Sequence, residues 1–347
     1  MKSFDAKFLQ KMSFNPATAW FLSQCAEARG MQDMWKSVKP EVMKKLRESA
    51  IIQSAESSNR MEGVEVNKKR LLELVMHHKQ PLDRPEEEIA GYRKALDFIH
   101  NNYKQISMTP ESIKKLHELA QGGLVGDADK WKERNNDIIE IHPNGERIIR
   151  FSPVPPEDVQ KYIEQLCLGY RDTVANNRIP ELVAVAGFVF DFLCIHPFRD
   201  GNGRVSRLIT LLLLYQNGYE VGRYISLERI VEETKEGYYE TLKRSSQNWF
   251  DASHDLVPWW NYFIGTIKSA YQELKTRVEM SSPDDTMSSL IRQTALAFIT
   301  AFSVADICKQ HPAIDRELVK KVLASLKSEG LLMLSGKGRG ARWKKLP

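Results

Sequence analysis

The sequence predicts a mainly α-helical protein with a small C-terminal domain. Apolar residues recur at spacings of three and four along much of the chain, and the one convincing strand pattern before the tail is a hairpin at 138–151. A polar, proline-containing stretch at 280–287 then precedes a basic tail. We therefore expect a helical bundle with a small β-hairpin beside it, a linker, and a separate tail domain.

Composition narrows the class of protein. With 347 residues, 42% of them hydrophobic and 27% charged, the chain can bury a core. The N-terminus lacks a signal-peptide pattern and the longest apolar run, 208–215, is too short to span a bilayer, so we expect a cytoplasmic protein with no membrane partner. Single, scattered cysteines indicate buried thiols rather than disulfides or zinc: Cys25, Cys167, Cys194 and Cys308.

The N-terminal region, residues 1–105, is predicted to be helical. One stripe of a helix over about 41–63 repeats at every fourth position: Val42, Leu46, Ala50, Ser54, Ser58 and Glu62. Ser58 and Glu62 are therefore expected on the same face of that helix.

A hairpin and an amphipathic helix follow. The segments IIEIH and RIIRF of residues 138–151 flank the turn residues Pro143, Asn144 and Gly145, which predicts two paired strands. Residues 157–176 carry apolar side chains at helical spacing, so we expect one face of this helix to be buried.

Two largely buried helices form the predicted centre. Residues 181–195 are apolar almost all round, with Pro180 expected in the first turn and Pro197 ending the helix. Residues 204–217 form the second helix, and Gly218 is placed where a left-handed cap is expected.

The segment between these helices, HPFRDGNGR at 196–204, carries the chemistry. Two glycines around an asparagine, leading into a helix N-terminus, favour a loop whose N–H groups bind phosphate. Arg204 and Arg207 lie three apart on one helix face and suit a triphosphate. Asp200 offers a hard oxygen for Mg²⁺, and His196 can take a proton near neutral pH. A plain turn with a capping histidine and solvated arginines is the alternative.

The segment resembles the signature of the Fic-domain family, HxFx[DE]GNGRxxR. Every fixed position matches: His196, Phe198, Asp200, Gly201, Asn202, Gly203, Arg204 and Arg207. The resemblance implies a Fic-type helical bundle with a hairpin flap, in which residues 106–279 form the catalytic domain.

The resemblance also implies the reaction. His196 deprotonates a Ser, Thr or Tyr hydroxyl of a target protein, which attacks the α-phosphate of ATP, takes AMP and releases pyrophosphate. Asp200 holds Mg²⁺, while the loop amides of Gly201 and Gly203, with Asn202 and Arg204, grip the phosphates. The protein itself is one candidate target. Dimers are common among relatives, so a homodimer is a further expectation.

Two other segments match family features. Ile148, Ile149, Arg150 and Phe151 lie where a flap aligns the backbone of the target, the alternative being a purely structural hairpin. Tyr238 and Tyr239, followed by Leu242, resemble the YYxxL helix that borders the nucleoside. Adjacent helical tyrosines otherwise divide between core and surface.

Residues 58–63 match the inhibitory pattern [ST]xxxE[GN] of the family through Ser58, Glu62 and Gly63. In the resemblance, Glu62 pairs with Arg207 and keeps that guanidinium from the γ-phosphate of ATP. A surface glutamate at a helix end is the alternative. The same glutamate positions a water for AMP removal in some relatives, and the sequence leaves that reaction open.

The tail, residues 288–347, resembles a winged helix-turn-helix. Helices are expected at 304–310 and 315–329, with Asp315 as an N-cap and a turn at 311–314 between them. From Ser303 onward, ten basic and four acidic residues give a net charge of +6. Because the whole chain has a net charge of +5, the part before Ser303 carries −1. The basic wing suits DNA phosphates, although such domains also bind proteins: Lys337, Arg339, Arg342, Lys344 and Lys345.

Two function classes therefore compete. One is a protein adenylyltransferase with an accessory tail, and the other is a DNA-binding transcription regulator whose Fic core senses a nucleotide. The intact signature favours the enzyme. Relatives that transfer phosphate or phosphocholine usually carry a changed signature, so the unaltered Asp200, Gly203 and Arg207 favour AMP.

Overall fold

The computed structural model describes residues 2–122, 129–141, 146–280, 283–298, 300–311, 314–336 and 341–346. In this part of the chain, fifteen α-helices and two separate two-stranded sheets confirm the predicted mainly α fold. None of the helices in these residues is long and apolar enough to cross a membrane.

The chain divides into two compact units that differ from the predicted domains. The larger unit comprises Met1–Gly30 and Arg47–Leu274, and the smaller comprises Met31–Leu46 and Lys275–Pro347. The predicted N-terminal region and catalytic domain thus pack largely as one body. The predicted linker at 280–287 is also shorter, because α13 (Pro283–Ala297) begins inside it, with its proline at the helix start where no N–H is needed.

Residues 2–121 form a series of helices, of which the segment Met31–Leu46 belongs to the smaller unit and the rest to the larger. They are η1 (Lys2–Phe4), α1 (Ala6–Gln10), α2 (Pro16–Val38), α3 (Pro40–Arg60), α4 (Lys68–Val75), α5 (Arg84–Asn102) and α6 (Pro110–Gln121). Side chains of Asn67, Asp83 and Thr109 cap α4, α5 and α6 by accepting from backbone N–H groups of the first turn.

Helix α3 ends earlier than the sequence pattern predicts. Its last residue is Arg60, and Glu62 lies in the turn that follows. Gly63 adopts a φ of 78°, and the N–H groups of Gly63 and Val64 bond to the carbonyls of Arg60 and Asn59. This left-handed glycine closes the helix, as at many helix C-termini.

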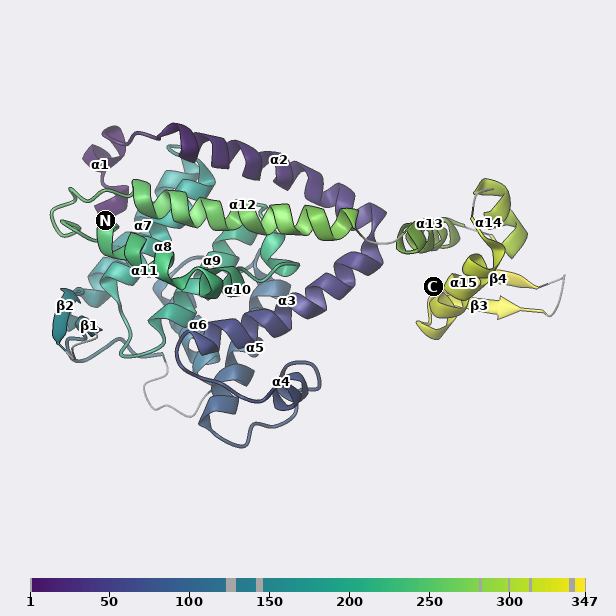
Figure 1. The fold of residues 1–347 in the computed structure, drawn as a ribbon, viewed down its shortest axis with the longest axis horizontal. Helices are drawn as coiled ribbons and strands as arrows, with labels where there is room; N and C mark the ends of the chain where they lie inside the picture. The colour runs from purple at the N-terminus through teal and green to yellow at the C-terminus, as the bar shows by residue number, and fades with distance from the viewer. Residues whose placement is uncertain are drawn as a thin grey trace. The chain divides into compact units, whose positions relative to one another are not determined.

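The core of the larger unit is built around α8 (Glu181–Ile195) and α9 (Asn202–Gln216), which lie in the middle of the helical unit in Figure 1. Nearly all side chains of both are buried, and the amphipathic α7 (Val159–Ala175) packs on α8. Pro180 is the N-cap of α8 rather than a first-turn residue. Gly218 has the expected left-handed conformation after α9, with a φ of 81°.

The hairpin lies at the edge of this unit (Figure 1). Strand β1 (Ile138–Ile141) pairs antiparallel with β2 (Arg147–Phe151), and the register shifts between Ile138 and Ile139. The predicted turn, Pro143, Asn144 and Gly145, lies outside the described residues. A short η2 (Pro156–Asp158) leads into α7.

Four further helices follow α9, and the last of them runs past Leu274, the last residue of the larger unit. They are η3 (Val221–Arg223), α10 (Leu227–Glu233), α11 (Lys235–Ser245) and α12 (Val257–Glu279). All four cysteines of the chain are free thiols, three of them buried.

The smaller unit has its own apolar core. Helices α13, α14 (Val304–Gln310) and α15 (Arg316–Ser328) are followed by β3 (Leu332–Ser335) and β4 (Arg342–Lys345), which pair antiparallel. Trp343 is buried and bridges to Phe302, and Asp315 caps α15 as expected. The expected wing residues Lys337 and Arg339, and residues 312 and 313 of the expected turn, lie outside the described residues.

Candidate active site

The loop at 196–203 is shaped by two left-handed residues. His196 is the C-cap of α8, with φ 52° and ψ 60°, a left-handed backbone conformation that is uncommon for residues other than glycine. Gly201 has a φ of 81° and immediately precedes α9, whose first N–H groups have no intrahelical acceptor. A Cβ at Gly201 would also crowd the amide of Gln121. The loop therefore turns sharply into a helix N-terminus, the setting predicted for phosphate binding.

Phe198 anchors this loop in the core. Its fully buried ring stacks on His117 with centroids 3.8 Å apart, and its N–H and C=O bond to the amide of Asn202 at 2.9 and 2.8 Å. The side chain of Asn202 thus fixes the shape of the loop. Each of its polar atoms keeps one further hydrogen-bonding position, and its role at the phosphates stays a prediction.

His196 is held as a neutral base. Burial lowers the pKa of His196 to about 4, and its Nδ1 lies 3.3 Å from the carbonyl oxygen of Leu193. In the neutral ring Nδ1 carries the proton and donates to that carbonyl, so Nε2 keeps its lone pair. A neutral Nε2 can accept a proton from a hydroxyl brought into the site.

His196 lines a cavity of ≈ 360 Å³ in the larger unit, within the size range of ligand pockets. Eight of the predicted site residues line it: Glu62, Arg150, Phe151, His196, Gly203, Arg207, Tyr238 and Tyr239. The cavity thus brings together the loop at 196–203, the hairpin, α11 and the turn after α3.

The guanidinium of Arg207 is bound by the predicted inhibitory motif. Its Nε donates to the Ser58 hydroxyl at 2.8 Å, and its Nη2 donates to the Ser58 carbonyl at 2.9 Å and to the Glu62 carboxylate at 2.7 Å. Burial disfavours the charge, but the nearby Glu62 carboxylate holds the pKa of Arg207 above its ordinary value. A side chain at Gly203 would collide with Glu62, so the carboxylate sits against the first turn of α9.

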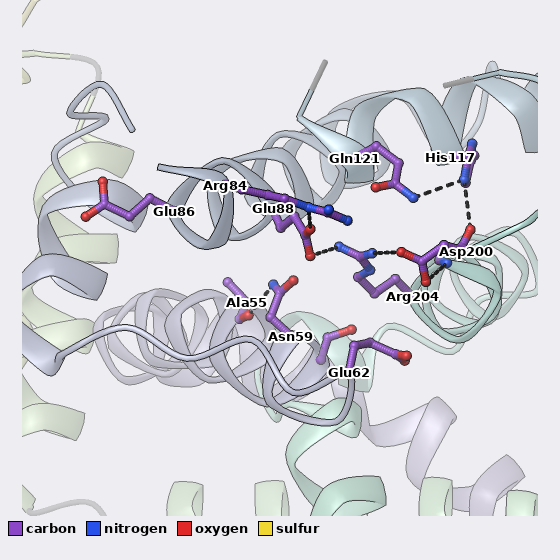
Figure 2. A network of polar contacts seen from close by, with 12 residues as sticks. Ala55, Asn59, Glu62, Arg84, Glu86, Glu88, His117, Gln121, Asp200 and Arg204 are labelled. Carbon is purple, nitrogen blue, oxygen red and sulfur yellow. Dashed lines mark hydrogen bonds and ion pairs between the residues drawn. The ribbon is translucent and has the colours of Figure 1, made fainter. Parts of the chain in front are cut away.

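Arg204, one turn earlier, has different partners (Figure 2). Its Nη1 donates to Glu88 of α5 at 2.8 Å, and Glu88 also binds Arg84. Its Nη2 lies 3.6 Å from the Asp200 carboxylate. The Arg204 side chain is only 2% exposed and does not line the cavity, so it stabilises the loop through its ion pairs and not through the cavity.

Asp200 is the candidate magnesium ligand. Its side chain is 59% exposed, and one carboxylate oxygen accepts the N–H of Gly201 at 2.7 Å. Within the described residues no cluster of three or more acidic, histidine or cysteine side chains could hold a metal. A single exposed carboxylate still fits Mg²⁺, which takes one or two protein carboxylates, substrate phosphates and water.

The two matched segments divide between cavity and surface. Arg150 and Phe151 of β2 line the cavity, whereas Ile148 and Ile149 are exposed. Tyr238 is buried and Tyr239 is 41% exposed, although both reach the cavity. The Arg150 guanidinium lies 5.9 Å from the ring centre of Tyr239, which links the hairpin to α11.

Residues 107–214 match the family model described as Fic/DOC family. These residues form a Fic/DOC family domain. The match contains the whole of the loop at 196–203, all of α8, and α9 as far as Leu214.

Part of the chain is similar in sequence to curated proteins. A stretch of 138 residues, 39% of the chain, is 27% identical to protein adenylyltransferase fic-1 of Caenorhabditis elegans, and 136 residues are 24% identical to a Fido domain-containing protein of Dictyostelium discoideum. The chain spans 25% of the length of the first relative and 87% of the second.

Solved structures share the fold. A Fic family protein from Desulfovibrio desulfuricans matches 96% of this chain and 97% of its own with a TM-score of 0.62 at 21% identity. A Fic domain containing signaling protein from Bacteroides thetaiotaomicron matches 76% of this chain and 98% of its own with a TM-score of 0.63 at 20% identity.

Several residues at the Fic site were not foreseen from the sequence. Asn136 donates from its amide to the Phe198 carbonyl at 2.8 Å, and the N–H of Lys132 donates to the Pro197 carbonyl at 2.8 Å. The ammonium of Lys132 is buried and bonds to Asn136 and to the carbonyl of Ile195. Burial lowers the pKa of Lys132 to about 8, with Asp137 opposing the shift. These residues precede β1 in a polar stretch with no motif to mark them.

Proposed function

We propose that this protein is a protein adenylyltransferase that moves AMP from ATP to a Ser, Thr or Tyr hydroxyl of a target protein. The observation that carries the proposal is the position of a neutral His196 in a cavity that also holds Arg207 and the N-terminus of α9. The similarity to protein adenylyltransferase fic-1 supports the same chemistry.

The chain supplies a base and positive charge. Nε2 of His196 takes the proton of the target hydroxyl, whose oxygen forms a bond to the α-phosphorus as the bond to the bridging oxygen of the β-phosphate breaks. Pyrophosphate then leaves. The N–H groups at the start of α9 and the guanidinium of Arg207 offset the phosphate charge. Tyr238 and Tyr239 border the nucleoside, and β2 aligns the target strand.

Magnesium fits the exposed carboxylate of Asp200, which would hold it from the same loop as His196, although Asp200 does not itself line the cavity. When bound, the ion neutralises phosphate charge. Arg204 is not assigned to the phosphates, because Glu88 binds it away from the cavity.

We also propose that Glu62 restrains the enzyme. The carboxylate occupies the guanidinium of Arg207, which therefore cannot take the γ-phosphate of ATP. Ser58 adds two more hydrogen bonds to the same guanidinium, so the turn after α3 is held in place.

The test is transfer of label from α-³²P-ATP with magnesium, into the protein itself and into a cytoplasmic lysate. We expect label with Glu62→Gly and none when His196→Ala is added, because only the second variant lacks the base. Label that persists in the double variant would contradict the role of His196. No label in any sample would favour AMP removal, in which Glu62 positions water.

A second function is favoured by the smaller unit. Helices α14 and α15 with the β3–β4 hairpin resemble a winged helix-turn-helix, and Arg342, Lys344 and Lys345 lie on β4. We propose that this unit binds duplex DNA through its basic hairpin. An affinity for duplex DNA that falls steeply with salt and changes with ATP would support a transcription regulator. If the protein does not change the gel mobility of duplex DNA, the smaller unit would instead be assigned to binding a protein partner.

A further inference from the structure

A buried carboxyl group of α10 is bonded to α3 one turn before the inhibitory motif. Glu228 is 1% exposed. Its carboxyl oxygens accept from the hydroxyl of Ser54 at 2.7 Å, from Tyr92 of α5 at 3.0 Å, and from Ser226 at 3.2 Å. Ser54 lies four residues before Ser58, so this contact fixes the helical turn that precedes Ser58.

A second carboxylate of α10 holds α3 just after Ser58. Glu232, one turn beyond Glu228, accepts from Nε of Arg60, and its other oxygen accepts from Nη2 at 3.0 Å. Burial raises the pKa of Glu232, but hydrogen bonds from Arg60 and Ser57 outweigh it and leave the pKa below its ordinary value. A forked contact of this kind is geometrically specific.

The two contacts flank Ser58, one of the two residues that bind Arg207. Ser54 and Arg60 lie on either side of Ser58, and Arg60 is the last residue of α3 before the turn that carries Glu62. Neither Glu228 nor Glu232 lines the cavity of His196. Both therefore act on the site through α3, and neither touches the reacting atoms.

We propose that α10 is a latch for α3, whose two glutamates fix the end of that helix and thereby keep Glu62 on Arg207. The inference rests on the proposed restraint by Glu62. Glu228 and Glu232 are positioning residues in this scheme. Displacing α10 loosens the end of α3, and so frees Arg207 without any change in the inhibitory motif.

The test uses a double variant that carries Ser54→Ala and Glu232→Gln in one chain. Alanine favours helix more than serine, so α3 should stay helical while losing its tie to Glu228. The matched control is Glu233→Gln, because Glu233 lies on the same helix but pairs with Arg229 and not with α3. Glu62→Gly, alone and with the latch changes, completes the set.

We expect AMP transfer by the double variant to rise about tenfold or more over wild type, with the control unchanged. Added to Glu62→Gly, the latch changes should give no further rise, because the contact that they maintain is already absent. Amide hydrogen exchange at 58–63 should be about tenfold faster in the double variant, while exchange in α8 and α9 stays at its wild-type rate.

The outcomes separate the latch from the proposed function. Wild-type transfer in the double variant, beside high transfer with Glu62→Gly, overturns the latch and leaves the restraint standing. Unchanged exchange at 58–63 overturns the latch whatever the activity. If Glu62→Gly is itself inactive, the proposed function fails, and exchange alone then decides whether α10 holds α3. Faster exchange throughout the unit would also contradict the latch, because it would indicate general destabilisation.

Discussion

Arg204 and Arg207 lie one turn apart on α9, and each pairs with a glutamate from the N-terminal part of the chain. The Arg204 pair is enclosed, with side chains 2% and 6% exposed for Arg204 and Glu88. In the Arg207 pair the guanidinium is 7% exposed, but Glu62 is 28% exposed and lies beyond the end of its helix.

The difference lies in what each glutamate is attached to. Glu88 is in the second turn of α5, which packs on α6 and α9, so it cannot leave without disturbing the core. Glu62 is carried by a turn and faces a cavity. The same ion-pair chemistry therefore supports the loop at Arg204, whereas at Arg207 it can be withdrawn.

The largest expected effect separates the two glutamates by activity. Glu62→Gly should raise the rate of AMP transfer by about 10³, since an arginine made available to the phosphates is worth ~10³ to 10⁵ in related phosphate transfer. Glu88→Gly should give no rise, because it frees a guanidinium that does not face the cavity. Initial rates of labelling measure both, and a comparable rise with Glu88→Gly would remove the distinction.

Stability should show the opposite order. Glu88→Ala leaves Arg204 buried with a distant carboxylate, and loss of one partner of a buried pair costs about 3–5 kcal/mol. Glu62→Ala should cost less, because Ser58 still binds Arg207 through two hydrogen bonds. Urea unfolding of both variants measures the free energies. Equal losses would mean that Glu62 is as structural as Glu88.

Exchanging each arginine for lysine sharpens the comparison further. Arg204→Lys keeps the charge but loses the fork that spans Glu88 and Asp200, so we expect lower stability. Arg207→Lys, placed in the Glu62→Gly chain, should lower transfer about tenfold or more with little loss of stability. Unfolding midpoints and labelling rates are measured on both chains. A reversed pattern would exchange the two roles.

Much of this site was predictable because local rules dominate it. The left-handed glycines Gly201 and Gly218 and the Asp315 cap of α15 each depend on neighbouring residues. The pairing of Glu62 with Arg207 was predicted only through the family resemblance, since 145 residues separate the two.

The partners that were missed lie far away in sequence and carry no motif. Glu88 is 116 residues from Arg204, and His117 stacks on Phe198 from α6. Nothing in the helical pattern distinguishes these side chains from solvated ones. The early end of α3 had a local signal in Gly63, but the sequence interpretation continued the helix through it.

The titration of the histidines supplies a last and smaller prediction. Burial lowers the pKa of four of them: His117, His196 and His254 to about 4, and His100 to about 3. Between pH 6.5 and 4 the unfolded chain therefore binds more protons than the folded chain. The free energy of unfolding should fall as the pH is lowered through this range. Asp191, whose pKa burial raises to about 6, acts in the opposite sense but is one group against four.

His117→Gln should reduce this slope by up to about 1.36 kcal/mol per pH unit, the value for one proton. The change of slope, and not the loss of stacking on Phe198, is the readout, because stacking shifts stability equally at each pH. Urea unfolding at pH 7, 6 and 5 gives the slopes. An unaltered slope would mean that His117 titrates in the folded chain as it does in the unfolded one. The ring of His117 would then not be shielded from solvent in the folded chain.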